Sequence, residues 1–376
     1  MSVEKTVLIT GSNGFVGRNL QVALSRLADV RVLCFDQDNN QHQLAEYLQE
    51  ADLVFHLAGV NRPKDPEEFT VGNKELTENI VSLLEQQGRT PVVVMSSSTQ
   101  AALDNPYGQS KRAAEECLLA YGARTGAPVF VYRLTNIFGK WSRPNYNSVV
   151  STFCYNISHG IDITMSSPDN VVELIYIDDV VAEFLAVLQG ERTASSETLT
   201  AGPTYRITLA DLADSVSQFR SFRTTLKLPD MSDDLTRKLY ATYLSYLEPD
   251  DFAYGLDIKK DHRGELAELI KSESFGQIFV SRTCGKIIRG NHYHDTKIEK
   301  FCVLQGEAAI RFRHLFSDET IDYRVSGAKW EVVDIPPGYT HHIENLSDQD
   351  MIVLFWANCI FDPQQPDTVY CEVKRG

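Results

Sequence analysis

The sequence has no long apolar run and no excess of basic residues. Its 376 residues include 51 acidic and 36 basic side chains, which give a net charge of −15. Nucleic acids and anionic membrane surfaces both present negative phosphates, so this charge argues against either as a partner. The first residues lack a basic segment followed by an apolar core, and no later run approaches the roughly 18 apolar residues of a membrane span. We therefore expect no signal peptide and no membrane anchor.

The cysteines are scattered and odd in number. There are seven, and no two form a CxxC pair. Disulfide frameworks use even numbers of cysteines, so we expect a reduced, cytoplasmic protein with structural thiols. The length allows at least two cores, and no low-complexity linker separates them. We place the domain boundary between Glu248 and Pro249, which gives domains of residues 1–248 and 249–376.

A glycine loop lies between a predicted strand and a predicted helix near the start. The β-rich run 7–10 precedes Gly11, Gly14 and Gly17, and a helical pattern of leucines follows. Glycines let a backbone approach a pyrophosphate, and a helix N-terminus offers free N–H groups. This order predicts a dinucleotide site rather than a simple turn. Asp36, at the end of the second strand, favours NAD through the ribose hydroxyls, whereas Arg18 would meet a 2′-phosphate and favour NADP.

Tyr107 and Lys111 lie four residues apart, so one helical face presents both side chains. We expect the ammonium to lower the pKa of the phenol, which then delivers a proton to a carbonyl oxygen while hydride arrives at carbon. A serine at the end of the fourth strand would hold that oxygen, and Ser97 and Ser98 are the candidates. Two such residues are often mere surface neighbours, but the preceding glycine loop and serine run favour catalysis.

These motifs resemble those of the extended short-chain dehydrogenase/reductases. The resemblance implies a Rossmann-type doubly wound parallel sheet and, by register with the family, Ser98 as the serine that holds the carbonyl oxygen, with Ser97 as the reserve. Asn73 matches either the family's structural asparagine or an ordinary helix-surface residue. Only eight residues separate Ser98 from Tyr107, fewer than most members have, so a substrate loop is missing or moved. The cofactor-binding residues that the resemblance implies are Gly11, Asn13, Gly14, Phe15, Val16, Gly17, Arg18, Asp36, Leu57, Ala58, Tyr107 and Lys111.

A second group of polar residues lies in the last third of the chain. His292 and His294 share a face of a predicted strand, and Glu299 reaches the same point after a short loop. His341 follows a Pro-Gly turn at the start of a returning strand. Three histidines and a carboxylate suit a divalent metal. The competing interpretation is a solvent-exposed or core histidine pair, which the four filled positions disfavour.

The spacing of these residues resembles both cupin motifs, which implies an all-β barrel with His292, His294, Glu299 and His341 as metal ligands. A second resemblance is to the metal-free 3,5-epimerases of nucleotide 4-keto sugars, through Asp261-x-Arg263-Gly264, Phe275-x-Gln277 and Arg289-Gly290-x-His292. It implies His292 as the base and Lys300 as an assisting acid/base or enolate stabiliser. Strand alternation, however, places Lys300 on the face opposite Glu299.

The order of the two motif sets resembles the bifunctional CapF-type enzymes of capsule and O-antigen synthesis. The resemblance implies C3 epimerisation of UDP-2-acetamido-2,6-dideoxy-4-hexulose, a UDP-linked 4-keto amino sugar, followed by reduction at C4 to UDP-2-acetamido-2,6-dideoxy-L-talose. It also implies NADPH, with NADH as the alternative, together with zinc in the barrel and a homodimer. Two other interpretations stay open, namely a plain 4-ketoreductase with a non-catalytic barrel and a dinucleotide-sensing regulator.

Overall fold

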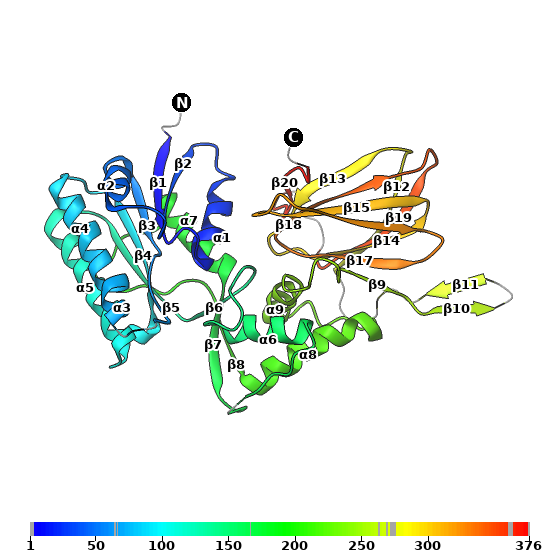
Figure 1. Ribbon diagram of the computed structural model, residues 1–376, viewed down its shortest axis with the longest axis horizontal. Helices are drawn as coiled ribbons and strands as arrows, with labels where there is room; N and C mark the ends of the chain where they lie inside the picture. Colours follow the sequence, from blue (N-terminus) through cyan, green and yellow to red (C-terminus); the bar gives the residue numbers. More distant parts are fainter. Residues whose placement is uncertain are drawn as a thin grey trace. The chain divides into compact units, whose positions relative to one another are not determined.

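The computed structural model describes residues 4–374 apart from 64, 66, 166, 262–263, 268–269, 271–275 and 360–363, with no side chains described at 258–261, 264–267 and 277. The chain forms two compact units, one of Met1–Ser148 with Val172–Arg206 and one of Val149–Val171 with Ile207–Gly376 (Figure 1). Residues 207–248, which the sequence predicts to be largely helical, therefore belong to the same unit as the barrel. The domain boundary after Glu248 stays a prediction. Among the helices described, none is long and apolar enough to cross a membrane.

The first unit contains a five-stranded parallel sheet in the order β2-β1-β3-β4-β5. Its strands are nearly continuous apolar runs because helices cover both faces. On one face, Phe184 packs against Phe55 and Tyr132, with ring centroids 5.5 Å apart in both pairs. The strands are β1 (Lys5–Thr10), β2 (Val30–Phe35), β3 (Leu53–His56), β4 (Val92–Ser98) and β5 (Val129–Leu134).

The helices of this unit begin and end at residues that suit those positions. Asn40 forms a capping box with Gln43, and Asn105 caps the helix whose first residue is Pro106. The helices are α1 (Phe15–Leu24), α2 (Gln41–Glu50), α3 (Glu67–Phe69), α4 (Leu76–Gln86), α5 (Pro106–Thr125) and α7 (Ile177–Leu188), with a π-helix η1 (Thr70–Glu75) and a 3₁₀ helix η2 (Thr99–Ala102). Three further strands form a small sheet, β6 (Asn136–Phe138), β7 (Val171–Tyr176) and β8 (Thr204–Thr208).

The strand order reverses next to β1, since β2 lies on one side of it and β3 on the other. In open parallel sheets, ligands bind beyond the carboxyl ends of the strands at such a switch point. The glycine loop follows β1 directly, and Leu57 and Ala58 follow β3. The chain order alone therefore brings the two predicted cofactor segments to one edge of the sheet.

The second unit combines three helices with an antiparallel barrel. Its two five-stranded sheets have the orders β12-β19-β14-β17-β9 and β16-β15-β18-β13-β20. The predicted combination of a Rossmann-type domain with a cupin-like β domain is confirmed. The helices are α6 (Val149–Ser158), α8 (Leu209–Thr225) and α9 (Asp234–Leu244); the strands are β9 (Ala253–Gly255), β12 (Gln277–Thr283), β13 (Ile288–Tyr293), β14 (Glu299–Gln305), β15 (Glu307–His314), β16 (Thr320–Ser326), β17 (Glu331–Ile335), β18 (Tyr339–Asn345), β19 (Met351–Ala357) and β20 (Val369–Tyr370), and β10 (Ile258–Asp261) and β11 (Gly264–Ala267) form a hairpin.

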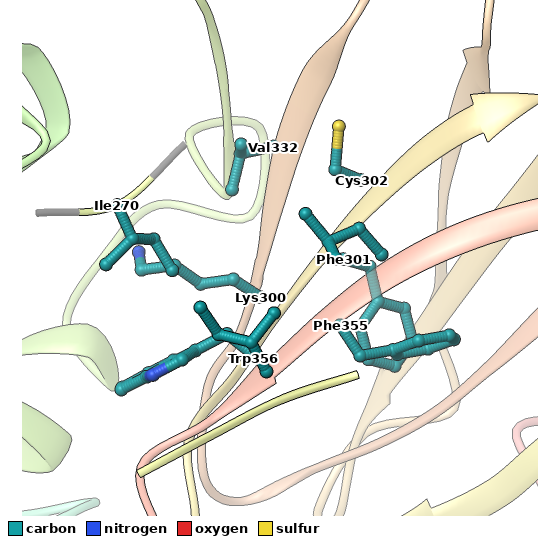
Figure 2. A pocket seen from close by; sticks show the side chains of 9 residues that line it. Ile270, Lys300, Phe301, Cys302, Val332, Phe355 and Trp356 are labelled. Carbon is teal, nitrogen blue, oxygen red and sulfur yellow. The ribbon is translucent and has the colours of Figure 1, made fainter. Parts of the chain in front are cut away.

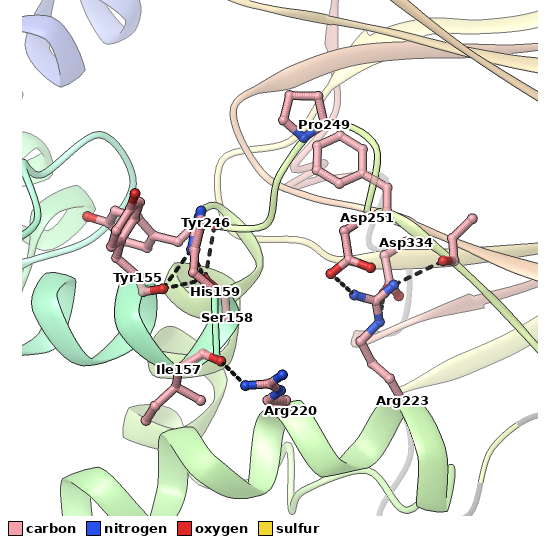
Figure 3. Close-up of polar contacts among 12 residues, drawn as sticks. Tyr155, Ile157, Ser158, His159, Arg220, Arg223, Tyr246, Pro249, Asp251 and Asp334 are labelled. Carbon is pink, nitrogen blue, oxygen red and sulfur yellow. Dashed lines mark hydrogen bonds and ion pairs between the residues drawn. The ribbon is translucent and has the colours of Figure 1, made fainter. Parts of the chain in front are cut away.

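Arg223 of α8 joins the helices of this unit to the barrel (Figure 3). Its guanidinium donates to the Asp251 carboxylate at 2.7 Å and to the Ala253 carbonyl at 3.2 Å. It also lies 4.9 Å from the centre of the Tyr254 ring, and its Nε is 3.9 Å from Oδ2 of the fully buried Asp334 on β17. One cation thus contacts the connecting segment and a barrel strand together.

Candidate active sites

The glycine loop after β1 fits tightly against the segment after β3. Gly11 has a φ of +71°, and a Cβ there would lie 2.7 Å from the Ala58 backbone. A Cβ on Gly17 would lie 2.3 Å from the Gly11 carbonyl oxygen, so α1 approaches the loop only because residue 17 has no side chain. The predicted residues of the loop and the segment at Leu57–Ala58 therefore meet at the N-terminus of α1, where its first N–H groups can hold a pyrophosphate.

Asp36 lies just beyond β2 and contacts the same loop. Its Oδ2 accepts the backbone N–H of Asn13 at 2.8 Å, and its Oδ1 accepts that of Gln37 at 2.8 Å. The carboxylate thus fixes the loop and borders the place expected for an adenosine ribose. Arg18 is exposed on the first turns of α1. Both determinants of NAD and NADP preference are present, and the choice between them stays a prediction.

Tyr107 and Lys111 lie on one face of α5. The Lys111 ammonium donates to the Ser96 carbonyl at 2.8 Å, and burial lowers its pKa to about 8. The Tyr107 ring packs 5.5 Å from that of Phe69, and burial raises the pKa of its phenol, although a hydrogen bond with Ser98 acts in the opposite direction. The expected lowering of the phenol pKa by Lys111 is therefore not seen: the pKa of Tyr107 is raised by burial, and Lys111 is not among the causes of its shift.

The two serines considered at the end of β4 have different surroundings. Ser97 is buried and donates to the Glu115 carboxylate, which also accepts a bidentate pair from Arg133 at 3.0 and 2.6 Å. Ser98 is only half-buried and accepts the Gln100 N–H at 3.2 Å. Ser97 has a structural partner, so the geometry favours Ser98 as the hydroxyl that faces a substrate oxygen.

Asn73 is buried in the π-helix η1 rather than exposed on a helix surface. Its Oδ1 accepts the Val60 N–H at 2.9 Å, and its Nδ2 donates to the Val60 carbonyl and to Ser110 Oγ, both at 3.0 Å. It thereby fixes the loop beyond β3 to the helix that presents Tyr107. Short π-helical turns are frequent at functional sites. The structural alternative for Asn73 is the correct one.

The four predicted metal ligands converge inside the barrel. One ligand atom from each of His292, His294, Glu299 and His341 lies within 4.8 Å of the others. His292 and His341 are cross-strand neighbours on β13 and β18, with ring centroids 4.7 Å apart. Two aromatic rings lie beside the cluster, those of Phe301 and Phe312, 5.8 and 6.3 Å from that of His341.

The protonation of the cluster suits a cation. His294 Nδ1 donates to the Asp367 carbonyl, and its Nε2 lies 3.2 Å from Glu299 Oε2. Nε2 is therefore the ring atom that would bind a metal beside Glu299. Burial lowers the pKa of His292 to about 3 and also lowers that of His341; neither ring nitrogen of His341 has a hydrogen-bonding partner among the described residues. Burial alone would raise the pKa of Glu299, but the adjacent His294 and His341 rings, with Nε2 atoms 3.2 and 3.7 Å from its Oε2, hold it well below its usual range. Neutral imidazoles and an ionised carboxylate fit zinc.

Lys297 is a residue of this site that the sequence motifs did not reveal. Its Nζ lies 2.9 Å from Glu299 Oε1, and its side chain is 13% exposed. The loop between His294 and β14 brings it there. A lysine in a loop carries no periodic signal. Only its position two residues before the predicted ligand Glu299 hints at a place in the site.

Lys300 does not face the cluster. It follows Glu299 on the regular strand β14, so it points to the outer face of the sheet, as alternation predicts. There it pairs with Asp334, lies 3.2 Å from Tyr254 Oη, and borders a mainly apolar cavity of about 210 Å³ (Figure 2). Of the competing epimerase-like motif, Arg263 and Phe275 lie outside the described residues. The catalytic role of Lys300 stays a prediction.

Comparisons with known proteins identify the family of both parts of the chain. Residues 7–202 match the model of the NAD dependent epimerase/dehydratase family, and residues 259–369 match that of the polysaccharide biosynthesis C-terminal domain. A UDP-2-acetamido-2,6-beta-L-arabino-hexul-4-ose reductase from Pseudomonas aeruginosa is 43% identical over 370 residues, which are 98% of this chain and 99% of the relative.

Solved structures give the same result. The capsular polysaccharide assembling protein CapF from Staphylococcus aureus is 41% identical, with a TM-score of 0.67 over 98% of this chain and 100% of that chain. A UDP-glucuronic acid 4-epimerase from Bacillus cereus in complex with NAD, at 17% identity and a TM-score of 0.52, shares the fold over 57% of this chain and 84% of its own. The chain therefore belongs to the NAD dependent epimerase/dehydratase family, in the CapF-type group whose members continue into a polysaccharide biosynthesis C-terminal domain.

Proposed function

We propose that the chain converts a UDP-linked 4-keto amino sugar in two steps, C3 epimerisation in the barrel and NADPH-dependent reduction at C4 in the Rossmann-type unit. The product would be UDP-2-acetamido-2,6-dideoxy-L-talose, on the way to a capsule or O-antigen sugar. The observation that carries the proposal is that one chain contains both a Tyr107–Lys111 pair and a separate His/Glu cluster. The name of the P. aeruginosa relative, a hexul-4-ose reductase, supports the substrate class.

In the reduction, NADPH bound at the glycine loop would supply a hydride to C4. The phenol of Tyr107 donates its proton to the oxygen that becomes the C4 hydroxyl, and Ser98 Oγ holds that oxygen. Lys111 is fixed by the Ser96 carbonyl on the same face of α5 as Tyr107, and its positive charge would stabilise the phenolate that forms. The raised pKa of Tyr107 keeps it protonated, as a proton donor must be.

In the epimerisation, a divalent metal held by His292, His294, Glu299 and His341 would supply positive charge that acidifies the proton beside the ketone. His294, Glu299 and His341 are buried, and a charge in such a low-dielectric surrounding acts more strongly than in water. Lys297 adds a cationic side chain beside the cluster, and its 2.9 Å contact with Glu299 supports a role in stabilising developing negative charge. We assign this role to Lys297 in preference to Lys300, whose Nζ pairs with Asp334 on the outer face.

The test is to incubate the UDP-4-keto sugar with the full chain in deuterated water without NADPH and to measure deuterium at C3 by NMR and mass spectrometry. We expect uptake that is lost after metal chelation and in His292→Ala, and retained in the surface control His42→Ala. NADPH added to an already epimerised ketone should still be oxidised by the chelated protein, because reduction uses the other site.

The other results would support the alternatives. Uptake that survives chelation but is lost in His292→Ala would favour the metal-free epimerases, with His292 as the base. No uptake by folded, metal-loaded protein would make the barrel a non-catalytic module of a plain 4-ketoreductase. Binding of NADPH without any turnover would favour a dinucleotide sensor. The homodimer is a separate proposal, which sedimentation of the purified chain would test.

A further inference from the structure

The segment 367–373 runs beside the strand that carries His292. Tyr370 on β20 pairs in antiparallel register with His292 on β13. Arg313 also holds the segment: its side chain is buried, and it donates to two of the segment's carbonyl oxygens at 2.9 and 2.8 Å. The segment is therefore fixed in place next to the His/Glu cluster.

Asp367, the first residue of this segment, contacts the loop between His294 and β14 through several groups. Its carboxylate accepts the backbone N–H groups of Asp295 at 2.9 Å, Thr296 at 2.8 Å and Lys297 at 2.6 Å, and also Thr296 Oγ1 at 2.7 Å. Its backbone carbonyl accepts from His294 Nδ1. Consecutive N–H groups that point at one carboxylate form a strong, charge-assisted set of hydrogen bonds.

These contacts reach two of the four cluster residues. The bond to His294 Nδ1 fixes the tautomer and turns Nε2 toward the cluster. The bonds to the loop fix the backbone of Lys297, whose Nζ holds Glu299 Oε1 at 2.9 Å and leaves Oε2 facing His294. Asp367 thus orients His294 through its backbone carbonyl, and its carboxylate orients Glu299 through the loop and Lys297.

We infer that Asp367 is a positioning residue for metal binding: it preorganises His294 and Glu299 by holding the intervening loop. The inference rests on the metal centre of the proposed function. Asparagine at this position would replace one accepting oxygen by an amide N–H₂ that faces other donors, so Asp367→Asn weakens the loop contacts with almost no change in size.

The experiment uses the full-length chain, stripped of metal, and Co²⁺ as the probe. Co²⁺ affinity is measured by competition with a chromophoric chelator, and the visible absorption of bound Co²⁺ reports the ligand geometry. For Asp367→Asn we expect affinity lower by about 10- to 100-fold and an altered spectrum, as for other residues that orient metal ligands. Asp348→Asn, at a side chain that is 86% exposed, is the matched control and should resemble the wild type.

The outcomes separate this inference from the proposed function. If the wild type binds Co²⁺ and Asp367→Asn binds it within twofold and with the same spectrum, the inference is overturned while the metal centre stands. If the folded wild type binds no Co²⁺, both are overturned. Should Asp367→Asn fail to fold, Thr296→Val is the substitute, because it removes only the hydroxyl bond to the Asp367 carboxylate. We expect this variant to lose less Co²⁺ affinity than Asp367→Asn. An unchanged Co²⁺ affinity and an unchanged spectrum would overturn the inference.

Discussion

Replacing Lys300 tests whether this lysine is structural or catalytic. Its side chain is 6% exposed and that of Asp334 is fully buried, so the pair lies out of water. Burial alone would lower the pKa of Lys300, but the adjacent Asp334 carboxylate raises it well above its usual range. A lysine that keeps its proton so firmly is a poor base, and its face of β14 is not that of Glu299. We therefore predict that the pair stabilises the barrel and takes no part in proton transfer.

The size of the effect follows from what Lys300→Met leaves behind. Asp334 would keep a distant cation, Arg223 Nε at 3.9 Å, and its Oδ2 has no hydrogen-bonding partner among the described residues. Leaving one member of a buried pair unpaired costs about 3–5 kcal/mol, whereas replacing both members by apolar side chains is often neutral or stabilising. Lys300→Met should therefore destabilise the barrel by that amount, and Lys300→Met/Asp334→Leu should recover most of it.

Urea unfolding followed by tryptophan fluorescence measures the stability, because Trp356 is the cross-strand neighbour of Lys300. Deuterium uptake at C3 measures the chemistry. The double variant should bind metal and exchange deuterium at close to the wild-type rate. A stable, metal-loaded double variant without exchange would refute the structural assignment, and an unchanged stability of Lys300→Met would refute the buried-pair reasoning.

Three further predictions concern the Rossmann-type unit. Tyr107→Phe should slow NADPH oxidation by about 10²- to 10⁴-fold, the usual contribution of a positioned acid, while NADPH binding measured by fluorescence stays intact; a normal rate would contradict the role of the phenol. Because burial lowers the pKa of Lys111 to about 8, its ammonium is lost as pH rises through that value, so kcat/KM for reduction should fall there, and a rising profile would contradict the assignment. In an unfolded chain lysine keeps its proton to about pH 10.4, so below pH 8 folding must bury the charged form of Lys111, which lowers the free energy of unfolding. This loss of stability disappears as the pH rises from about 8 to about 10.4, because the folded chain then buries a neutral amine. Arg18→Ala should raise KM for NADPH far more than KM for NADH if Arg18 meets the 2′-phosphate; equal effects would favour selection through Asp36.

The sequence predicts those parts of both sites that depend on local geometry. The loop from Gly11 to Gly17 needs only a strand before it and a helix after it, and Tyr107 and Lys111 share a face because a helix has 3.6 residues per turn. His292 and His294 converge with Glu299 and His341 because alternation and one turn fix their direction. Apart from His341, whose spacing resembles that of a cupin motif, each of these predictions uses a periodicity that is visible within a few residues.

The sequence does not predict contacts between distant segments. Asp367 lies 73 residues from His294, and no local pattern connects them. The choice between Ser97 and Ser98 depends on Glu115, a residue of a different element, and the pKa of Tyr107 depends on how deeply α5 packs. The same limit applies to the residues between 207 and 248, whose helical pattern is visible but whose packing against the barrel is not.

The position of Asp367 in the chain has a consequence for the order in which the two sites mature during synthesis. The elements around the glycine loop and Tyr107 are complete once the ribosome has passed residue 206. The four cluster residues have been made by residue 341, but the carboxylate that holds their loop is added 26 positions later. Nascent chains arrested just before Asp367 should therefore already bind dinucleotide while taking up Co²⁺ poorly, which a series of arrested chains of increasing length would reveal.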